Sequence, residues 1–329
     1  MILAGDVGGT KAVLALFEIK DGRCRRASEE VVYASRDAAS LEELVERFLH
    51  GFPNTPLAAA CFGVAGTLVE GKADAVNLPW CITEANLARV AHVSRIKLLN
   101  DLEAAAYGML QLPTDEFAVL NPGIARRGNA AVIAAGTGLG EALLIWNGKH
   151  HLAISSEGGH ASFSPRNEEE IELLRHLQKQ FGDHVSWERV VSGPGQWNIY
   201  HFLRETGSEA EPAWLARNIE TGDASAAISE AGISGRDPVC ARAVELFASL
   251  YGAEASNLAL KALTIGGIYI GGGIAPKILP ALKQNDRFLR AFTDKGRFSK
   301  LLREIPIKVA LNPRAPLLGA AAYAAERLL

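Results

Sequence analysis

The chain has 329 residues, of which 48% are hydrophobic, and its formal net charge is −3. This length accommodates two domains, and a charge so near neutral, without a dominant basic tract, argues against nucleic acid as the main partner. The four cysteines form no CxxC pair or Cys/His spacing, and glycines and charges interrupt the apolar runs, so we expect a cytoplasmic protein with no signal peptide, membrane span or structural zinc site.

The first predicted element is a β-hairpin. Two apolar runs, residues 1–4 and 12–17, flank a turn that contains two adjacent glycines. The candidate residues of this turn for binding a phosphate or its cation are Asp6, Gly8, Gly9, Thr10 and Lys11. Bare backbone N–H groups at the glycines can form a concave anion nest, and the carboxylate that ends the first run can hold Mg²⁺ through water. A tight turn without a ligand is the simpler interpretation of this segment alone.

Strands and helices then alternate through the first third of the chain. Periodicity and capping residues predict strands at 30–34, 57–64 and 96–100, and helices at 40–49, 83–90 and 102–108. Ser40 and Glu43 form a capping box at the start of the first of these helices.

The strand–turn–strand pattern recurs in the middle of the chain. Residues 130–135 and 141–146 are predicted strands joined by Gly136-Thr137-Gly138-Leu139-Gly140, which suggests two halves of similar design, each aiming a glycine-rich turn at one ligand. Further strands are predicted at 117–120, 268–270 and 307–311, and helices at 168–181, 193–204, 237–263 and 316–329. Alternating strands and helices indicate the α/β class.

Three glycine clusters each follow a β-like run, and they are Gly8-Gly9, the Gly136/Gly138/Gly140 turn and Gly271-Gly272-Gly273. Several such turns favour one polyanionic ligand, and tight turns without a ligand are the alternative. None has the GxxxxGK[ST] spacing of a P-loop. The middle cluster is GxGxG and leads into a β-like run rather than a helix, unlike a dinucleotide fingerprint.

Polar residues at three further places are candidates for binding and catalysis. Asn100-Asp101 lies at a strand-to-helix junction, where the helix N-terminus favours an ionised carboxylate able to accept a hydroxyl proton, although both residues are also favoured helix caps. Glu157 and His160 flank two glycines and can both hydrogen-bond one polyol, with an ordinary loop histidine as the alternative. Glu188 on its own is typical of a surface salt bridge.

Taken together, these segments resemble the motif series of bacterial ATP-dependent glucokinases, a family of the hexokinase–actin superfamily. The matching segments are Gly5–Lys11, Asn77-Leu78-Pro79-Trp80, Leu99–Ala104, Ala135–Gly140, Ser156-Glu157-Gly158-Gly159-His160 and Trp187–Gly195. Their order and spacing agree from the first residues to the terminal helix. The related ROK sugar kinases usually carry a cysteine-rich zinc motif after the histidine, whereas Ala161–Pro165 contains no cysteine, which indicates the non-zinc branch.

The resemblance implies a role for each candidate residue. Asp101 would be the base on the sugar 6-hydroxyl. The residues that would hold the sugar are Asn100, Asp101, Glu157, His160 and Glu188. Those at the ATP phosphates would be Asp6, Gly8, Gly9, Thr10, Lys11, Gly136, Thr137 and Gly138, with Asp6 near Mg²⁺ and with Lys11 in place of the more usual Asn. Gly271, Gly272 and Gly273 would lie by the adenosine.

The resemblance also implies a two-lobed actin-like ATPase fold, ribonuclease H-like in each lobe, with the active site in the interlobe cleft. The small lobe would comprise residues 1–110 plus 312–329 and the large lobe residues 111–311, with hinges near 108–113 and 312–316. The implied reaction is transfer of the γ-phosphoryl group of MgATP to glucose, giving glucose 6-phosphate and ADP for glycolysis. A homodimer is left open.

Three alternatives remain at this point. The acceptor can be another hexose, or the donor polyphosphate or ADP. The protein can be a sugar sensor that binds without turnover, which an intact Asp101 argues against. It can also be an actin-like filament ATPase, which the Glu157/His160 polyol site disfavours.

Overall fold

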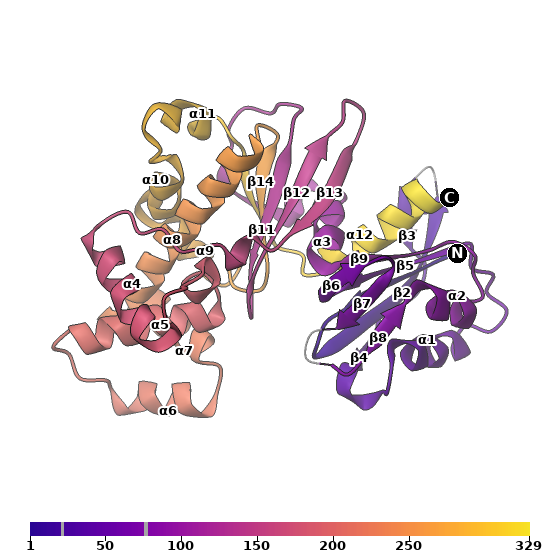
Figure 1. Cartoon of the computed structure of the whole chain (residues 1–329), viewed down its shortest axis with the longest axis horizontal. Coiled ribbons are helices and arrows are strands. Elements are labelled where there is room, and N and C mark those ends of the chain that lie inside the picture. Colours follow the sequence, from indigo (N-terminus) through magenta and orange to yellow (C-terminus); the bar gives the residue numbers. More distant parts are fainter. Residues whose placement is uncertain (21–22, 76–77) are drawn as a thin grey trace. The chain divides into compact units, whose positions relative to one another are not determined.

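The structure is a computed structural model that describes all residues except 21–22 and 76–77, so Asn77 of the motif series lies outside the described residues. The chain divides into two compact units (Figure 1). Unit 1 comprises Met1–Glu116, Ala153–Ser155 and Asn312–Leu329, and unit 2 comprises Phe117–Leu152 and Ser156–Leu311.

Unit 1 is an α/β body. Its strands are β1 (Ile2–Val7), β2 (Lys11–Lys20), β3 (Arg23–Arg26), β4 (Val31–Ala34), β5 (Ala59–Val64), β6 (Gly66–Val69), β7 (Lys72–Ala75), β8 (Cys81–Thr83) and β9 (Ile96–Asn100). Its helices are α1 (Leu41–His50), α2 (Glu84–Ala91), α3 (Asp101–Met109) and α12 (Ala315–Tyr323), the last followed by a π-helical turn at Ala324–Leu328.

The main sheet of unit 1 has the strand order β3-β2-β1-β5-β9, with β4 also paired to β2. β1 is antiparallel to β2 and parallel to β5, which is parallel to β9. The six residues of β5 are all buried, as expected for a central strand covered on both faces. Parallel pairing brings the carboxyl ends of β1, β5 and β9 to one edge of the sheet, where Asp6 and Asn100-Asp101 lie.

Unit 2 combines a second sheet with most of the helices. The strands of this sheet are β10 (Phe117–Asn121), β11 (Ala130–Ala135), β12 (Leu139–Trp146), β13 (His151–Ser156), β14 (Gly267–Gly271) and β15 (Ile307–Ala310), all of unit 2 except the middle of β13, Ala153–Ser155, which belongs to unit 1. The helices of unit 2 are α4 (Glu168–Phe181), α5 (Gly193–Thr206), α6 (Ala213–Thr221), α7 (Ala224–Ile233), α8 (Pro238–Ala262), α9 (Leu279–Lys283), α10 (Arg287–Thr293) and α11 (Ser299–Arg303).

The sheet of unit 2 repeats the strand order of unit 1. Its path is β10-β15-β14-β11-β12-β13, in which β11 is antiparallel to β12 and parallel to β14, and β14 is parallel to β15. Read from β13, the order β13-β12-β11-β14-β15 matches β3-β2-β1-β5-β9 strand for strand. The two halves of similar design therefore extend well beyond the two glycine-rich hairpins.

The helix α8 is the central helix of unit 2 (Figure 1). Asp237 caps it by accepting a hydrogen bond from the Cys240 N–H at 2.7 Å, and Pro238 occupies its first position. Most of its residues are buried. It contacts α5, α7, α9, α10 and β11.

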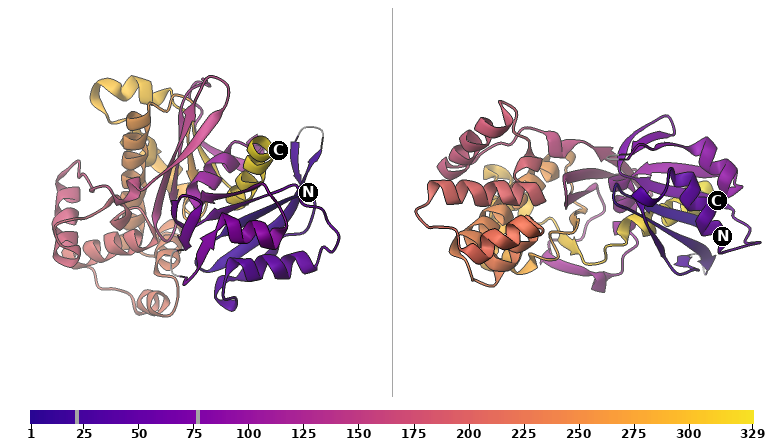
Figure 2. Two further views of the ribbon diagram at one scale, coloured as in Figure 1. Left: turned by 45° about the vertical axis from the view of Figure 1, so that its right-hand side comes forward. Right: turned by 90° about the horizontal axis from the view of Figure 1, so that it is seen from below.

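Helices α3 and α12 cross at very short distance within unit 1. A Cβ on Gly319 would lie 1.8 Å from the Ala104 carbonyl oxygen, and a Cβ on Gly108 would lie 1.8 Å from the Ala315 carbonyl oxygen. Figure 2 shows the terminal helix, in yellow, beside the indigo and purple strands of the same unit. Gly108, which we placed at a hinge, is therefore inside a helix and is explained by packing. Among the described residues, no helix has the length and apolar character needed to span a bilayer.

Candidate functional site

The hairpin turn between β1 and β2 is held by a residue that sequence reasoning missed. The Gly8 N–H donates to the Lys11 carbonyl at 2.9 Å and closes the turn. Buried Ser35 makes two hydrogen bonds to the turn: its hydroxyl donates to the Gly8 carbonyl at 2.8 Å, and its N–H donates to the Thr10 carbonyl at 3.0 Å. Thr10 and Lys11 are exposed. Neither glycine of the turn has a left-handed φ, so backbone strain does not explain them.

Asp6 lies near the end of β1, paired in register with Val13 on β2 and Gly63 on β5. Burial raises the pKa of its carboxyl from 3.8 to about 6, against the lowering effect of Lys11 and Arg314. A carboxylate held partly out of water gains from a nearby cation, and oxygen is the ligand that Mg²⁺ prefers. The residue therefore fits the predicted cation.

Asn100 is the N-cap of α3. Its side-chain oxygen accepts a hydrogen bond from the Leu102 N–H at 2.9 Å, and its amide donates to the Gly66 carbonyl at 3.2 Å. The Asn100 N–H bonds the Glu103 carboxylate, which completes a capping box. The cap interpretation of this asparagine is thus correct, and its side chain is held in one orientation beside Asp101.

Asp101 is the first residue of α3, and one of its carboxylate oxygens accepts a hydrogen bond from the Leu102 N–H at 2.9 Å. Its backbone is seated against β5, because a Cβ on Gly63 would lie 3.8 Å from the Asp101 Cα and 2.7 Å from the Ala104 Cβ. Gly63 is also the strand partner of Asp6. The predicted base and the predicted cation ligand, 95 positions apart in sequence, therefore border the same residue.

In unit 2 the turn after β11 is fixed to the start of α5. The Gly136 N–H donates to the Gly138 carbonyl at 2.8 Å, and the Gly193 N–H donates to the Gly136 carbonyl at 2.8 Å. Ser192 caps α5 by accepting from the Gly195 N–H at 3.0 Å. The exposed side chain of Thr137 lies at the tip of the turn.

Glu188 joins the sugar motif to this turn. Its carboxylate accepts a hydrogen bond from the Leu139 N–H at 3.0 Å, and its backbone carbonyl accepts from the Ser192 hydroxyl at 2.6 Å. A Cβ on Gly138 would lie 2.5 Å from a Glu188 carboxylate oxygen. The salt-bridge interpretation of Glu188 is therefore replaced by a hydrogen bond to the backbone of the glycine turn, with one carboxylate oxygen left for another partner.

The third glycine cluster lies beside the second. Gly271 pairs with Ala134. Gly272 has a φ of +79° and lies so close to the backbone of Ala135 that an added Cβ would be 2.2 Å from the Ala135 carbonyl oxygen. Gly136 and Gly273 differ from Gly272, because a Cβ on either would meet nothing within 4 Å and neither has a left-handed φ. The fold does not require glycine at these two positions, whereas close approach of a ligand to the backbone would.

The buried hydroxyl of Tyr251 on α8 supports the end of β11. It accepts a hydrogen bond from the Ala135 N–H at 3.1 Å and donates to the Ile133 carbonyl at 3.3 Å. Ala135 immediately precedes the Gly136 turn. Sequence reasoning missed this contact, because no local pattern pairs a helical tyrosine with a strand more than a hundred residues earlier.

Glu157 and His160 flank a short 3₁₀ turn, η3 (Gly158–His160). Their side chains are 77% and 61% exposed and approach each other to 3.9 Å, which leaves most of their polar atoms accessible to a ligand. The turn rests on the start of β12, because a Cβ on Gly159 would lie 2.0 Å from the Leu139 carbonyl oxygen. Leu139 is also the hydrogen-bond partner of Glu188, so the predicted sugar residues of unit 2 converge on one residue.

A buried acidic pair lies below this turn. A Cβ on Gly158 would lie 2.0 Å from a carboxylate oxygen of Glu141, which is 1% exposed. Burial and the neighbouring Glu254 raise the pKa of the Glu141 carboxyl well above its usual range. Glu254 also accepts from the Asn257 amide at 2.8 Å.

The structure thus groups the candidates within each unit. Unit 1 gathers Asp6, the Gly8–Lys11 turn, Asn100 and Asp101 at one sheet edge, and unit 2 gathers the second and third glycine clusters with Glu157, His160 and Glu188. Within the described parts of the chain, one group of three side chains lies close enough together to share a metal ion: His176 on α4 with His201 and Glu205 on α5. This group contains none of the candidate residues named above.

Comparison with known proteins gives consistent matches over the whole chain. A family model described as Glucokinase matches residues 3–327. A relative named Glucokinase from Trichormus variabilis is 41% identical over 341 residues, covering 99% of both chains, and one from Synechocystis is 38% identical over 348 residues, covering 98% of both.

Solved structures agree with these matches. A crystal structure of glucokinase from an Antarctic psychrotroph is 31% identical, with a TM-score of 0.85 over 98% of this chain and 97% of that one. A ROK family glucokinase from Streptomyces griseus, in complex with glucose and AMPPNP, is 21% identical with a TM-score of 0.64 and shows likeness of fold alone. These similarities confirm the predicted α/β actin-like ATPase fold.

Proposed function

The chain belongs to the glucokinase family, and we propose that it transfers the γ-phosphoryl group of ATP to the 6-hydroxyl of glucose, giving glucose 6-phosphate and ADP. The observation that supports this most is the placement of Asp101 at the start of α3, bordering the same Gly63 as Asp6. A proton acceptor for the sugar and a cation ligand for the nucleotide thereby lie at the same edge of one sheet, at the ends of the two strands that flank β5.

Asp101 acts as the general base. As the 6-oxygen of glucose forms its bond to the γ-phosphorus, the bond from that phosphorus to the β,γ-bridging oxygen breaks, and ADP leaves. The hydroxyl proton passes to the Asp101 carboxylate and later to water. The Leu102 N–H, 2.9 Å from one carboxylate oxygen, orients the group so that the other oxygen can face the acceptor. Asn100 is held beside it by its cap and hydrogen-bonds the sugar.

The glycine turns bind the nucleotide. Phosphoryl transfer relies mostly on positioning and on stabilising charge at the phosphate oxygens. We assign both the Gly8–Lys11 turn and the Gly136–Gly138 turn to these oxygens, with the backbone N–H groups that do not close the turns themselves as the donors. Open space at Gly136 and Gly273 supports this assignment, with the Gly271–Gly273 segment alongside the adenosine. Mg²⁺, when bound near Asp6, neutralises charge on the β- and γ-phosphates.

Glu157, His160 and Glu188 hold the remaining sugar hydroxyls. The exposed side chains of Glu157 and His160 can each bond a hydroxyl, and Glu188 has one carboxylate oxygen beyond the one bonded to Leu139. We assign Asp6, Asn100 and Asp101 to a small lobe of residues 1–110 plus 312–329, and the sugar residues of unit 2 to a large lobe of residues 111–311. A metabolic enzyme that uses ATP and glucose in this way belongs in the cytoplasm.

Product identification tests the proposal. Purified protein is incubated with MgATP and, in separate reactions, with glucose, mannose, fructose and N-acetylglucosamine, and phosphorus NMR follows the products. The proposal predicts ADP and glucose 6-phosphate in equal amounts, with glucose as the preferred sugar. Parallel reactions with ADP or polyphosphate test the donor. Phosphorylation of another hexose in preference to glucose, or sugar binding without turnover, contradicts it.

A further inference from the structure

A polar cavity of about 800 Å³ lies in unit 2, and none of the residues assigned above to ATP or glucose lines it. Its walls come from the segment before α4, from α8, from α10 and from α11. The lining includes Arg166, Ser249, Arg287, Arg290, Thr293 and Arg303. A volume of roughly 300–1,000 Å³ is typical of sites for small molecules.

The cavity is strongly basic. Four of its lining residues are arginines and one, Asp294, is acidic. Residues 283–303, which form much of the wall, carry seven basic and two acidic side chains, although the whole chain has a net charge of −3. Sequence analysis did not single out this stretch, because its basic residues are spaced along α10 and α11 rather than adjacent. The fold gathers them around one concavity.

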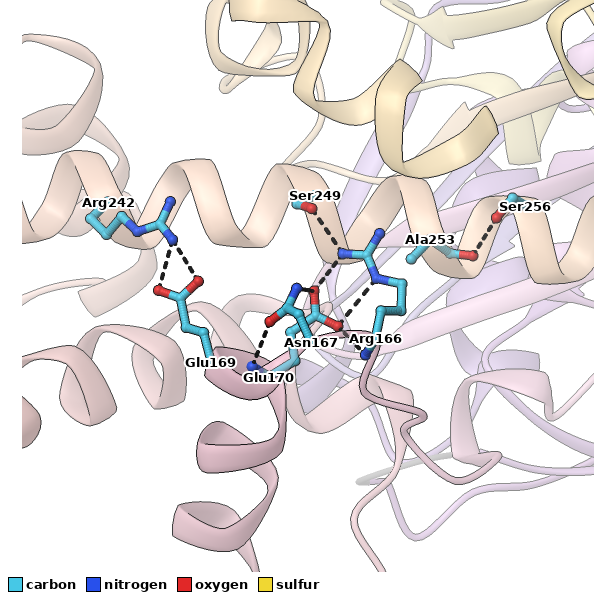
Figure 3. Close-up of polar contacts among 8 residues, drawn as sticks. All are labelled: Arg166, Asn167, Glu169, Glu170, Arg242, Ser249, Ala253 and Ser256. Atoms are coloured by element: carbon cyan, nitrogen blue, oxygen red, sulfur yellow. Dashed lines mark hydrogen bonds and ion pairs between the residues drawn. The ribbon is translucent and has the colours of Figure 1, made fainter. Parts of the chain in front are cut away.

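Two of the arginines are already engaged. Arg166 bonds buried Glu170 and donates to the Ser249 hydroxyl at 2.9 Å, which fixes it against α8 (Figure 3). Arg287 pairs with Glu245 at 2.8 Å, and its buried Nε has no hydrogen-bond partner among the described residues. These two side chains shape the floor of the cavity and contribute donors with their charge partly compensated.

The charges of the other two arginines are not compensated by an ion pair among the described residues. Arg290 and Arg303 are exposed, and neither has an ion-pair partner in the described part of the chain. The hydroxyls of Ser249 and Ser299 add neutral donors to the same wall, whereas the Thr293 hydroxyl donates to the Leu289 carbonyl at 2.9 Å. Arginine presents a planar fork of N–H donors that matches phosphate oxygens, and hydroxyls bond the remaining ones.

We propose that this cavity is a binding site for a small metabolite that carries a phosphoryl group, distinct from the substrate residues and additional to the proposed function. A phosphate monoester with a short polar body matches the basic, hydroxyl-rich lining and the volume. A nucleic acid strand would instead call for a basic groove continued along the surface with aromatic stacking partners. Arg290 and Arg303 are the side chains that bind the phosphoryl group directly.

Binding measurements test this independently of activity. Titration calorimetry is performed on the full chain with saturating glucose and a non-hydrolysable ATP analogue, so that the substrate site is occupied. The probes are inorganic phosphate, glycerol 3-phosphate and fructose 6-phosphate, with fructose as the uncharged counterpart. The first two distinguish free phosphate from an ester. Binding here does not depend on turnover, so loss of kinase activity and loss of this site are separable results.

Variants of the two free arginines locate the site. Arg290→Ala/Arg303→Ala is expected to weaken phosphoryl binding by about tenfold or more, because it removes the two side chains that bond the phosphoryl group directly. Lys300→Ala, which removes the same charge from an exposed residue of α11 outside the lining, should leave affinity unchanged. Absence of binding by every phosphoryl probe at millimolar concentration, equal weakening in both variants, or preferential binding of an oligonucleotide overturns the proposal.

Discussion

Asp6 and Asp101 border the same residue, Gly63: Asp6 pairs with it across the parallel β1–β5 ladder, and a Cβ on it would lie 3.8 Å from the Asp101 Cα. The parallel order β1-β5-β9 produces this relationship, because it brings the carboxyl ends of β1 and β9 to the same edge on either side of β5. The absence of a side chain at Gly63 lets α3 settle onto β5.

Gly63→Ala therefore tests the position of α3. The added Cβ would lie 2.7 Å from the Ala104 Cβ, so the start of the helix must move away from the strand. Overpacking of this kind costs roughly 1–3 kcal/mol. We expect a lower melting temperature and a fall in kcat that exceeds the change in KM for glucose. A folded variant with unchanged kcat would show that the seat of α3 on β5 does not set the position of Asp101.

Glu188 bonds the Leu139 N–H and is proposed to bond glucose, and two substitutions separate these two roles. Glu188→Ala removes the acceptor for the Leu139 N–H, so we expect KM to rise for both glucose and ATP as the glycine turn loosens. Glu188→Gln keeps an amide oxygen for that N–H but removes the charge, so KM should rise for glucose alone. If Glu188→Ala leaves the KM for ATP at its wild-type value, the hydrogen bond does not support the nucleotide turn.

Gly136 and Gly159 form a matched pair for alanine substitution. A Cβ on Gly159 would lie 2.0 Å from a backbone oxygen, so Gly159→Ala should displace the Glu157–His160 turn, lower stability and raise KM for glucose. A Cβ on Gly136 meets nothing within 4 Å, so Gly136→Ala should keep the wild-type melting temperature. We expect its KM for ATP to rise on the order of tenfold, about 1.4 kcal/mol. Unchanged ATP kinetics would place the phosphates away from this turn.

Asp6 gives a prediction about pH. Because burial raises the pKa of its carboxyl from 3.8 to about 6, the native state holds the proton where the unfolded state has released it. The free energy of unfolding therefore falls as pH rises from about 4 to 6, and above that range the penalty is roughly 3 kcal/mol. Asp6→Asn should melt several degrees higher than wild type at pH 8 without ligand, and the gain should vanish near pH 4.

The same variant should lose the use of MgATP while retaining glucose binding. Asp74→Asn makes the same change at an exposed position on β7 and is the control, with a melting temperature expected to match that of the wild type. Equal melting temperatures of Asp6→Asn and wild type at pH 8 would indicate that Asp6 is not destabilised by burial. Unchanged MgATP kinetics would remove it from the cation site.

The sequence predicts the two glycine-rich hairpins, the parallel strands and α8, because each is long or carries strong capping and turn residues. It misses the β6–β7–β8 sheet and α9 to α11, whose elements are three to seven residues long and too short for a periodic pattern to emerge. The predicted capping box at the start of α1 is half correct. The Ser40 hydroxyl oxygen accepts from the Glu43 N–H at 3.3 Å, but the Glu43 carboxylate accepts from the Ala39 N–H at 2.8 Å instead of the Ser40 N–H.

The missed site residues share another cause. Ser35, Tyr251 and the Glu141–Glu254 pair act through contacts between elements that are far apart in sequence, and a serine, a tyrosine or a glutamate in a periodic segment carries no local signal of such a contact. The glycines were informative for the opposite reason. A glycine is usually explained by a left-handed φ, by close packing or by close approach of a ligand. At Gly136 and Gly273 the fold shows neither of the first two, which leaves a ligand as the explanation.

Asp101→Asn tests the central claim most directly. The amide oxygen of asparagine can still accept from the Leu102 N–H, so α3 should start as before while the proton acceptor is lost. Glu103→Gln is the control, because it removes a charge from the same helical turn and can still bond the Asn100 N–H. The account predicts that kcat of Asp101→Asn falls by about 10²–10⁴-fold with glucose affinity retained, and that Glu103→Gln stays near wild type. A folded Asp101→Asn protein with near-wild-type kcat would contradict it.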